Sequence, residues 1–285
     1  MTATHNSYAP GHDASQTKHH EWRTAENSAV HLLPHLARLA PHTPHLKLLD
    51  VGAGSGTITA SLAKYLPPGG RITATDISDD ILLRARNHAA TQSLGTDKIT
   101  FLKASVYHLP FQDGEFDVVH AHQVLSHLGA PVDAIREMFR VCRPGGGGVV
   151  SLRETDMAMW CFWPETPALQ EGFRGLMART LTANGGQDRA GRRLVSWALA
   201  AGVPRGQIEA GFGTWCYSEP GDQRAWGEAM IERLKTGQMR SKGIEMGITT
   251  EQEIEDMIKA WREWVETEDA TLGIMNGEVI IKKGS

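Results

Sequence analysis

Short apolar runs alternate with amphipathic segments between residues 46 and 155. Five of the runs have the length of a buried strand: 46–51, 71–76, 98–105, 115–122 and 148–155. Three segments between them carry apolar residues at helical spacing: 56–66, 78–92 and 131–142. Strands and helices that alternate across short loops predict right-handed crossovers, and hence a doubly wound α/β fold with a parallel sheet.

The pattern changes after residue 155. Residues 154–164, ETDMAMWCFWP, combine methionines with aromatic residues, which suits either the wall of an apolar pocket or the buried face of a cap helix. Helices are expected up to about Leu181 and at three later ranges: 187–201, 219–234 and 250–266. Two more strands are expected near 207–217 and at 277–283, the latter as a short edge strand, which brings the sheet to seven strands.

Composition narrows the class of protein. The net charge of −4 offers no basic field for a nucleic-acid backbone, and no apolar run is long enough to cross a membrane. The three cysteines are widely spaced, which favours a reducing, cytoplasmic location. Eight of the thirteen histidines lie between His5 and His45 without metal-ligand spacing, so residues 1–18 are expected to form a flexible arm and no metal is expected.

The segment KLLDVGAGSGTIT, residues 47–59, suggests a nucleotide-like ligand. Gly52, Gly54 and Gly56 form G-x-G-x-G, one residue short of the dinucleotide pattern G-x-G-x-x-G. The lysine of the triphosphate loop G-x-x-x-x-G-K-[ST] is also missing. A ligand that carries an adenosine but no phosphate fits the loop better than either.

Other residues near the expected strand ends extend this site. Asp50 lies in the first strand, and Asp76 ends the second, where a carboxylate reaches ribose hydroxyls in doubly wound folds. Ile77 is placed to lie against an adenine face. The remaining residues expected to contact the ligand are Ala53 in the loop, Ala104, Ser105 and Val106 at or after the end of the third strand, and His120 in the fourth.

These motifs, together with LPF at 109–111, FD at 116–117 and RVCRPGGG at 140–147, cover residues 46–154. In combination they resemble the class I S-adenosylmethionine-dependent methyltransferases, particularly the ubiquinone and menaquinone biosynthesis C-methyltransferases. The resemblance implies a Rossmann-like fold, with S-adenosylmethionine as cofactor and S-adenosylhomocysteine as product. It implies a cofactor half over 46–155 and cap elements within 156–276 of a domain spanning 46–285. The family's usual acid falls on Ser105, so the contact to the adenine amino group is open.

The segment before the first strand also carries candidate residues. HHEWRTAENSAVHLL, residues 19–33, resembles an N-terminal segment that folds over the cofactor in this branch, so residues 1–45 are expected to form an arm with lid helices. Arg23 would pair with the methionyl carboxylate, for which a guanidinium is a bidentate match. The alternatives are a surface arginine at Arg23 and an ordinary core residue at Trp22.

Three histidines are candidate general bases: His120, His122 and His127. They follow or end the fourth strand, where this fold places the methyl group, although structural hydrogen bonding is the favoured role for His127. Candidate walls of the acceptor pocket are Trp22, Met157, Trp160, Phe162 and Trp163.

The C-terminal segments GTWCYSEPGDQRAWGEAMIERL, AWREWVE and GEVIIKK extend the resemblance to fungal gliotoxin-type thiomethyltransferases. It implies S-methylation of a small-molecule secondary metabolite, the dithiol of a reduced epidithiodiketopiperazine. Two alternatives stay open: C- or O-methylation of a quinone-like or phenolic metabolite, and a non-catalytic S-adenosylmethionine-binding regulator. We expect a small-molecule acceptor, no nucleic-acid or membrane partner, and a monomer or weak homodimer.

Overall fold

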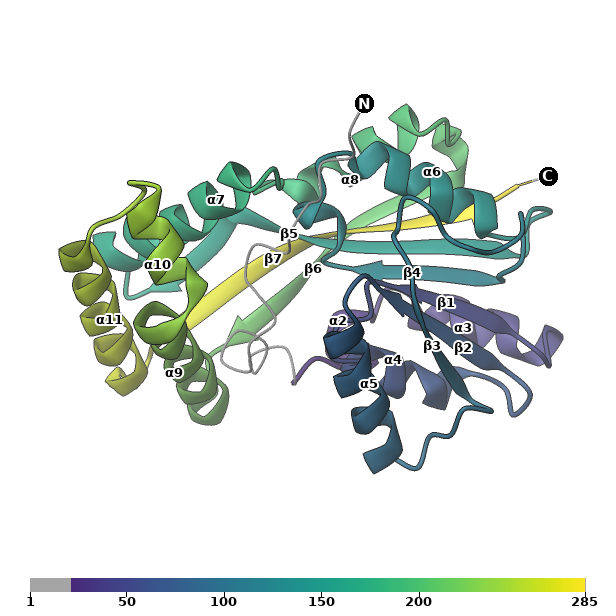
Figure 1. Ribbon diagram of the computed structural model, residues 1–285, viewed down its shortest axis with the longest axis horizontal. Coiled ribbons are helices and arrows are strands. Elements are labelled where there is room, and N and C mark those ends of the chain that lie inside the picture. The colour runs from purple at the N-terminus through teal and green to yellow at the C-terminus, as the bar shows by residue number, and fades with distance from the viewer. Residues whose placement is uncertain (1–21, 285) are drawn as a thin grey trace.

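A seven-stranded mixed sheet forms the centre of the molecule in a computed structural model that describes residues 22–284 (Figure 1). Its strands run in the order β3-β2-β1-β4-β5-β7-β6, and β7 is antiparallel to both of its neighbours. The strands are β1 (Lys47–Val51), β2 (Arg71–Asp76), β3 (Ile99–Lys103), β4 (Val118–His122), β5 (Gly148–Trp163), β6 (Ile208–Tyr217) and β7 (Thr271–Lys283). The expected α/β fold is confirmed.

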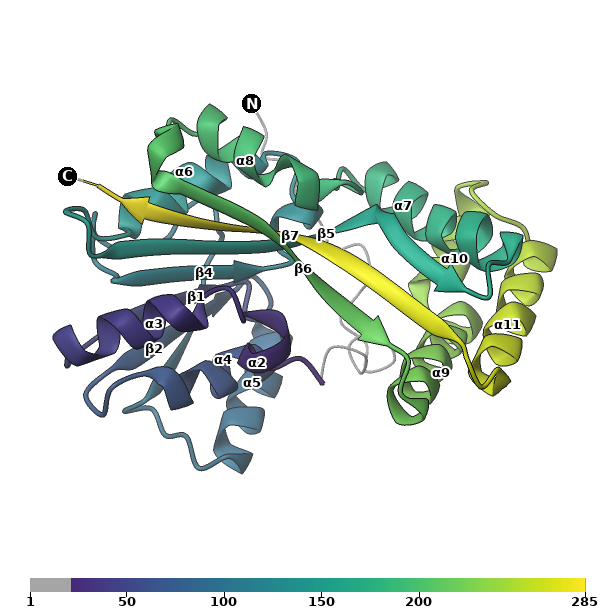
Figure 2. The same ribbon diagram turned by 180° about the vertical axis from the view of Figure 1, so that it is seen from behind.

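Helices cover both faces of the sheet (Figure 2). Those around the first five strands are α2 (Ala25–Ser28), α3 (Leu33–Leu39), η2 (Ala40–His42), α4 (Thr57–Leu62), η3 (Ala63–Tyr65), α5 (Asp79–Thr91), η4 (Leu125–His127) and α6 (Pro131–Val141). Those after β5 are η5 (Ala168–Phe173), α7 (Arg174–Ala183), α8 (Ala190–Ala200), η6 (Arg205–Gln207), α9 (Pro220–Thr236), α10 (Gln238–Glu245) and α11 (Glu251–Glu266). No helix within the described residues is long and apolar enough to span a bilayer.

Two expectations about the strands are wrong. β5 does not end near residue 155 but continues to Trp163, so the segment considered as a cap helix is the far half of a strand. β7 begins at Thr271 and lies between β5 and β6, so it is an inner strand of 13 residues rather than a short edge strand. Both β5 and β7 carry apolar residues on both faces, so their sequences lack the alternation of apolar and polar residues that identifies a half-buried strand. The expected flexible arm over residues 1–18 lies outside the described residues.

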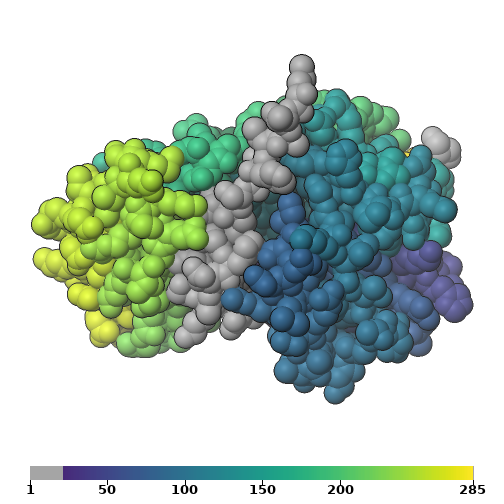
Figure 3. All heavy atoms as spheres, viewed as in Figure 1, coloured from purple at the N-terminus to yellow at the C-terminus, as the bar shows by residue number. Residues whose placement is uncertain are grey.

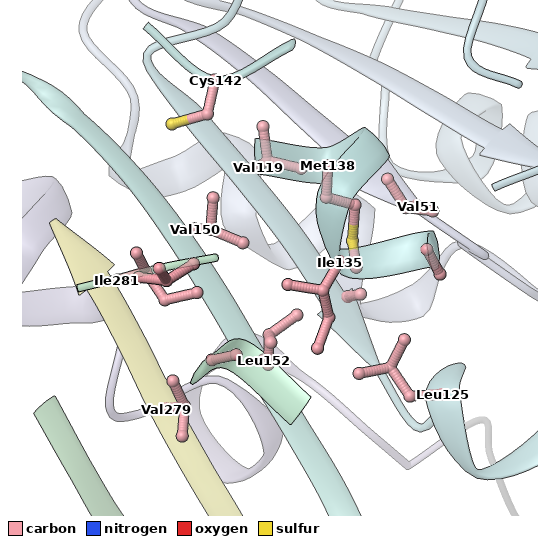
Figure 4. Packing of buried hydrophobic residues seen from close by; sticks show 14 of the residues in the cluster. Val51, Val119, Leu125, Ile135, Met138, Cys142, Val150, Leu152, Val279 and Ile281 are labelled. Carbon is pink, nitrogen blue, oxygen red and sulfur yellow. The ribbon is translucent and has the colours of Figure 1, made fainter. Parts of the chain in front are cut away.

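Three hydrophobic clusters hold the layers together. One lies between the sheet and helices α6 and α8, where Ile135 and Met138 meet Val119, Val150 and Ile281 (Figure 4). A second packs α2, α3 and α4 against the opposite face. The third joins the far halves of β5, β6 and β7 to the cap helices and centres on Trp261, which is fully buried. The three long strands therefore link the nucleotide-binding half directly to the cap.

Figure 3 shows the consequence for overall shape. The elements from β1 to α5 form one lobe, and the cap helices α9 to α11 form the other. β5, β6 and β7 run from the first lobe into the second (Figures 1 and 2). The functional site therefore has one wall from each lobe and a continuous sheet beneath it.

Candidate active site

The glycine loop between β1 and α4 requires left-handed backbone at three positions. Gly52, Gly54 and Gly56 have φ values of 68°, 57° and 76°, in the region that glycine enters without steric cost. Space is a second constraint, because a Cβ on Gly56 would lie 2.8 Å from the Cβ of Ala85 in α5. Gly56 precedes the first residue of α4. The loop therefore makes the tight turn from strand to helix that the sequence predicts.

Asp76 at the end of β2 faces this loop. One carboxylate oxygen accepts a hydrogen bond from the Gly54 N–H at 3.1 Å, and the other accepts from the Ser78 N–H at 3.1 Å. Asp50 lies deeper and accepts a hydrogen bond from the Thr59 hydroxyl at 2.5 Å. Burial, opposed by that hydrogen bond, raises the pKa of Asp50 to about 7. Two carboxylates thus lie beside the loop, and Asp50 is the more deeply buried of the two.

A cavity of about 1060 Å³ extends from the glycine loop into the cap and is called the central cavity below. Ten of the residues predicted for the cofactor line it: Arg23, Asp50, Gly52, Ala53, Gly54, Asp76, Ile77, Ala104, Ser105 and Val106. The hydroxyl of Ser105 accepts the N–H of Tyr107 at 3.3 Å. The cavity is large enough for a drug-sized ligand and a second small molecule.

Two predicted cofactor residues do not line the central cavity. Gly56 serves the turn and the packing against α5. His120 is fully buried, with its Nδ1 3.1 Å from the hydroxyl of Ser151. The segment between α2 and α3 packs over this face of the sheet, where the ring centroid of His31 lies 6.3 Å from that of His120. His120 therefore lies away from the cavity wall and is not placed there as a base. The expected cofactor contact of Gly56 stays a prediction.

The acceptor side of the cavity contains only part of the predicted pocket. Met157 and Trp160 line it. Phe162 lies farther along β5 and packs edge-on against Trp261 of the cap core, with ring centroids 5.8 Å apart. Trp163 points to the opposite face, is 56% exposed and donates its indole N–H to Asp269 at 3.0 Å. Both were expected in the pocket; Trp163 lies on the other face of the strand, and Phe162 lies beyond the cavity in the cap core.

Trp22 is also outside the cavity lining. Its ring packs edge-on behind the wall, with centroids 5.5 Å from Trp215 and 5.3 Å from Tyr217. Arg23, next in sequence, lines the cavity, is only 7% exposed and lies 4.9 Å above the Trp215 ring. The alternative of a surface arginine is therefore wrong.

His122 and His127 both line the central cavity. Burial, Arg23 and Arg233 lower the pKa of His127 to about 4. Burial also lowers the pKa of His122 well below its ordinary value, and Arg23 and Arg153 add to the effect. Both rings are therefore neutral near pH 7, and the conjugate acid of each is a strong acid for a histidine.

Several residues of the site escaped prediction from sequence. Glu154 in β5 is fully buried, and its carboxylate accepts hydrogen bonds from the N–H groups of Val124, Leu125 and Ser126 at 2.8, 2.7 and 3.1 Å. It fixes the loop that carries His127. The acceptor wall further contains Thr155, Met177, Trp215, Trp226, Arg233, Met239 and Ile274. The motif ETD at 154–156 is a sequence signal for Glu154, because it places two acids at the point where the fifth strand was expected to end.

Comparisons with known proteins agree with this geometry. Residues 49–150 match the family model described as a methyltransferase domain. An uncharacterized methyltransferase of Schizosaccharomyces pombe is 30% identical over 284 residues, which cover 97% of this chain and 96% of that protein. A probable methyltransferase, ltbC, of Aspergillus luteorubrus is 28% identical over 294 residues, with 99% of each chain covered.

A solved structure shares the fold. The phosphoethanolamine N-methyltransferase 2 of Haemonchus contortus, in complex with phosphomonomethylethanolamine and S-adenosylhomocysteine, superposes with a TM-score of 0.53 at 15% identity, over 90% of this chain and 54% of that one. The chain belongs to the class I S-adenosylmethionine-dependent methyltransferases, and its cofactor is S-adenosylmethionine.

Proposed function

We propose that this methyltransferase methylates thiol sulfur in a small molecule, and that a reduced epidithiodiketopiperazine with two thiols is its acceptor. The observation that carries the proposal is the chemistry of the acceptor wall. Among the described residues that line the cavity, the carboxylates are Asp50, Asp76 and Asp133, and all three belong to the nucleotide-binding half. The acceptor wall contains methionines, tryptophans, neutral histidines and the cationic Arg233 instead.

The weak basicity of these histidines favours a thiol over a phenol. A thiol with a pKa near 8.5 is about 10% ionised at pH 7.5, whereas a phenol with a pKa near 10 is about 0.3% ionised. A histidine whose conjugate acid has a pKa of about 4, such as His127, gains little by taking a proton from either group. Of these acceptors, a thiol therefore depends least on a general base in the acceptor wall.

The cofactor half of the proposal assigns three contacts. Asp76 accepts hydrogen bonds from the ribose hydroxyls, and Ile77 lies against adenine. Arg23 pairs with the methionyl carboxylate, which its position in the cavity wall and its low exposure support. S-adenosylmethionine supplies an electrophilic methyl group when bound, and positioning of the nucleophile against it accounts for much of the rate in such reactions.

Mass spectrometry of a methylation panel tests the acceptor chemistry. Purified protein and S-adenosylmethionine are incubated with a reduced epidithiodiketopiperazine, simple thiols, phenols and hydroquinones. We expect one or two methyl groups on sulfur, and Asp76→Ala protein serves as the control for contaminating activity. Methylation confined to oxygen or carbon would instead support the phenol or quinone alternative. Binding of S-adenosylhomocysteine without turnover of any acceptor would favour the non-catalytic regulator.

A further inference from the structure

His122 is held by a partner that can only donate hydrogen bonds. Its Nε2 lies 3.2 Å from the guanidinium Nη1 of Arg153. Arginine has no acceptor, so Nε2 must supply the lone pair, and the single proton of the neutral ring is on Nδ1. A histidine fixed in this form presents the Nδ1–H as a donor, while its basic nitrogen, Nε2, already accepts a hydrogen bond from Arg153.

Arg153 is itself firmly placed. It is 2% exposed, its Nε is 2.8 Å from the carboxylate of Glu278, and its guanidinium lies 4.4 Å above the Trp215 ring. His122 in β4, Arg153 in β5 and Glu278 in β7 are register partners, so they form one row across the sheet. The row ends at the central cavity, because His122 and Trp215 line it.

The other nitrogen of His122 is free to meet a ligand. Nδ1 has no hydrogen-bond partner among the described residues, and His122 is part of the wall of the central cavity. The charged and titratable groups that face the ring are Arg23 before α2, Arg153 in β5, His120 in β4 and His31 between α2 and α3. These groups are cationic or neutral, and the nearest carboxylate in the row, Glu278, is paired with Arg153. The surroundings therefore favour a negatively charged atom next to Nδ1.

We propose that His122 donates a hydrogen bond from Nδ1 to the nucleophilic sulfur of the acceptor and binds it as a thiolate, with Arg153 as the positioning residue that fixes the ring. This inference rests on the proposed thiol acceptor. The acceptor loses its proton to solvent, the thiolate lone pair forms the new S–CH₃ bond, and the electrons of the breaking C–S⁺ bond return to the cofactor sulfur. The Nδ1 proton stays on His122 throughout, so the residue is a donor and not a general base.

Nitrogen-15 spectroscopy tests the ring state without any acceptor. In two-bond ¹H–¹⁵N spectra, with the His122 signal assigned by its loss in His122→Asn, we expect a protonated Nδ1 and an unprotonated Nε2 at pH 7.5. In Arg153→Met, which removes the donor but keeps a side chain of similar length, the signal should move toward the other tautomer. A wild-type ring protonated at Nε2 would overturn the inference even if thiols are methylated.

The pH dependence of kcat, measured with the reduced epidithiodiketopiperazine, tests the role in catalysis. His122→Leu should lower kcat at pH 7 about 10- to 150-fold, the range for a hydrogen bond to a charged group. In the profile of kcat against pH, the acidic limb of the His122→Leu variant should move to higher pH by about one to two units, and most of the rate should return at high pH. His122→Asn, which restores a side-chain N–H near Nδ1, should recover much of the loss.

Two kinetic results would contradict the donor role. One is an equal loss in His122→Leu and His122→Asn at every pH, because a general base is not replaced by an amide. The other is an unchanged pH profile in both variants. Failure of the wild-type protein to methylate any thiol would refute the proposed function instead, while the spectroscopic result would still decide the state of His122.

Discussion

Replacement of Asp76 by alanine measures how much this carboxylate contributes to cofactor binding. The carboxylate connects β2 to the glycine loop through its 3.1 Å hydrogen bond with Gly54, and the same oxygen atoms lie in the cavity wall where the ribose is expected. The substitution removes a charged acceptor from the ligand and also releases one backbone N–H of the loop. Both effects weaken binding, so the two must be separated.

The expected magnitude follows from the charge on the acceptor. Hydrogen bonds to a charged group contribute about 1.5–3 kcal/mol, which corresponds to a dissociation constant raised about 10- to 150-fold. Asp76→Asn keeps one oxygen that can accept from Gly54, but it loses the charge and, because an amide has a single acceptor oxygen, the acceptor for the Ser78 N–H. We expect a smaller change of about 2- to 12-fold. The comparison of the two variants separates the loss of the acceptor for the Gly54 N–H from the loss of the charge and of the acceptor for the Ser78 N–H.

Isothermal titration calorimetry with S-adenosylhomocysteine measures these constants, and thermal unfolding of the unliganded proteins shows whether the loop survives. An Asp76→Ala protein that unfolds at the wild-type temperature and binds with an unchanged dissociation constant would refute the placement of the ribose. Equal weakening in the alanine and asparagine variants would mean that the charge, and not the geometry of the acceptor, controls affinity.

Three further predictions address packing, the acceptor pocket and pH. Gly56→Ala should cost about 1–3 kcal/mol more in urea unfolding than Gly145→Ala, because both have a positive φ but only the new Cβ at residue 56 meets a neighbour; equal losses would rule out the steric account. Trp160→Leu should raise the acceptor KM in steady-state assays, whereas Trp163→Leu on the outer face should not, and the reverse order would misplace the pocket. Burial raises the pKa of Glu154 to about 7 from about 4.5, so the stability contributed by its proton is present below about pH 4.5 and is lost as the pH rises through about 7. Glu154→Gln should flatten that part of the curve of unfolding free energy against pH, and an unchanged curve would contradict the assignment.

The nucleotide-binding half was predictable because its signals are local. The glycine spacing and the acid at the end of β2 lie within about 30 residues of one another along the chain, and the alternation of strands and helices is read from consecutive segments. The main correction there concerns His120, whose neighbours in the sheet are not its neighbours in the sequence.

The acceptor half was harder to predict because its residues meet through the sheet. The row of His122, Arg153 and Glu278 depends on the insertion of β7 between β5 and β6, and the last two residues are 125 positions apart. Trp160 and Trp163 have similar side chains and neighbouring positions, yet the strand places them on opposite faces. Without the strand assignment, composition could not tell the pocket wall from the outer surface.

The three long strands have a consequence for how such an enzyme diversifies. β5 carries Arg153 and Glu154 in its first half and Trp160 in its second, and a register shift separates Thr155 from Trp160. Substitutions beyond that shift change the residues that β5 contributes to the cap end of the cavity, while the first half, which pairs with β4 and β7, keeps the row of His122 and Arg153 in register. A lineage can therefore exchange one acceptor for another through mutations in the far halves of β5, β6 and β7, and keep the same methyl donor.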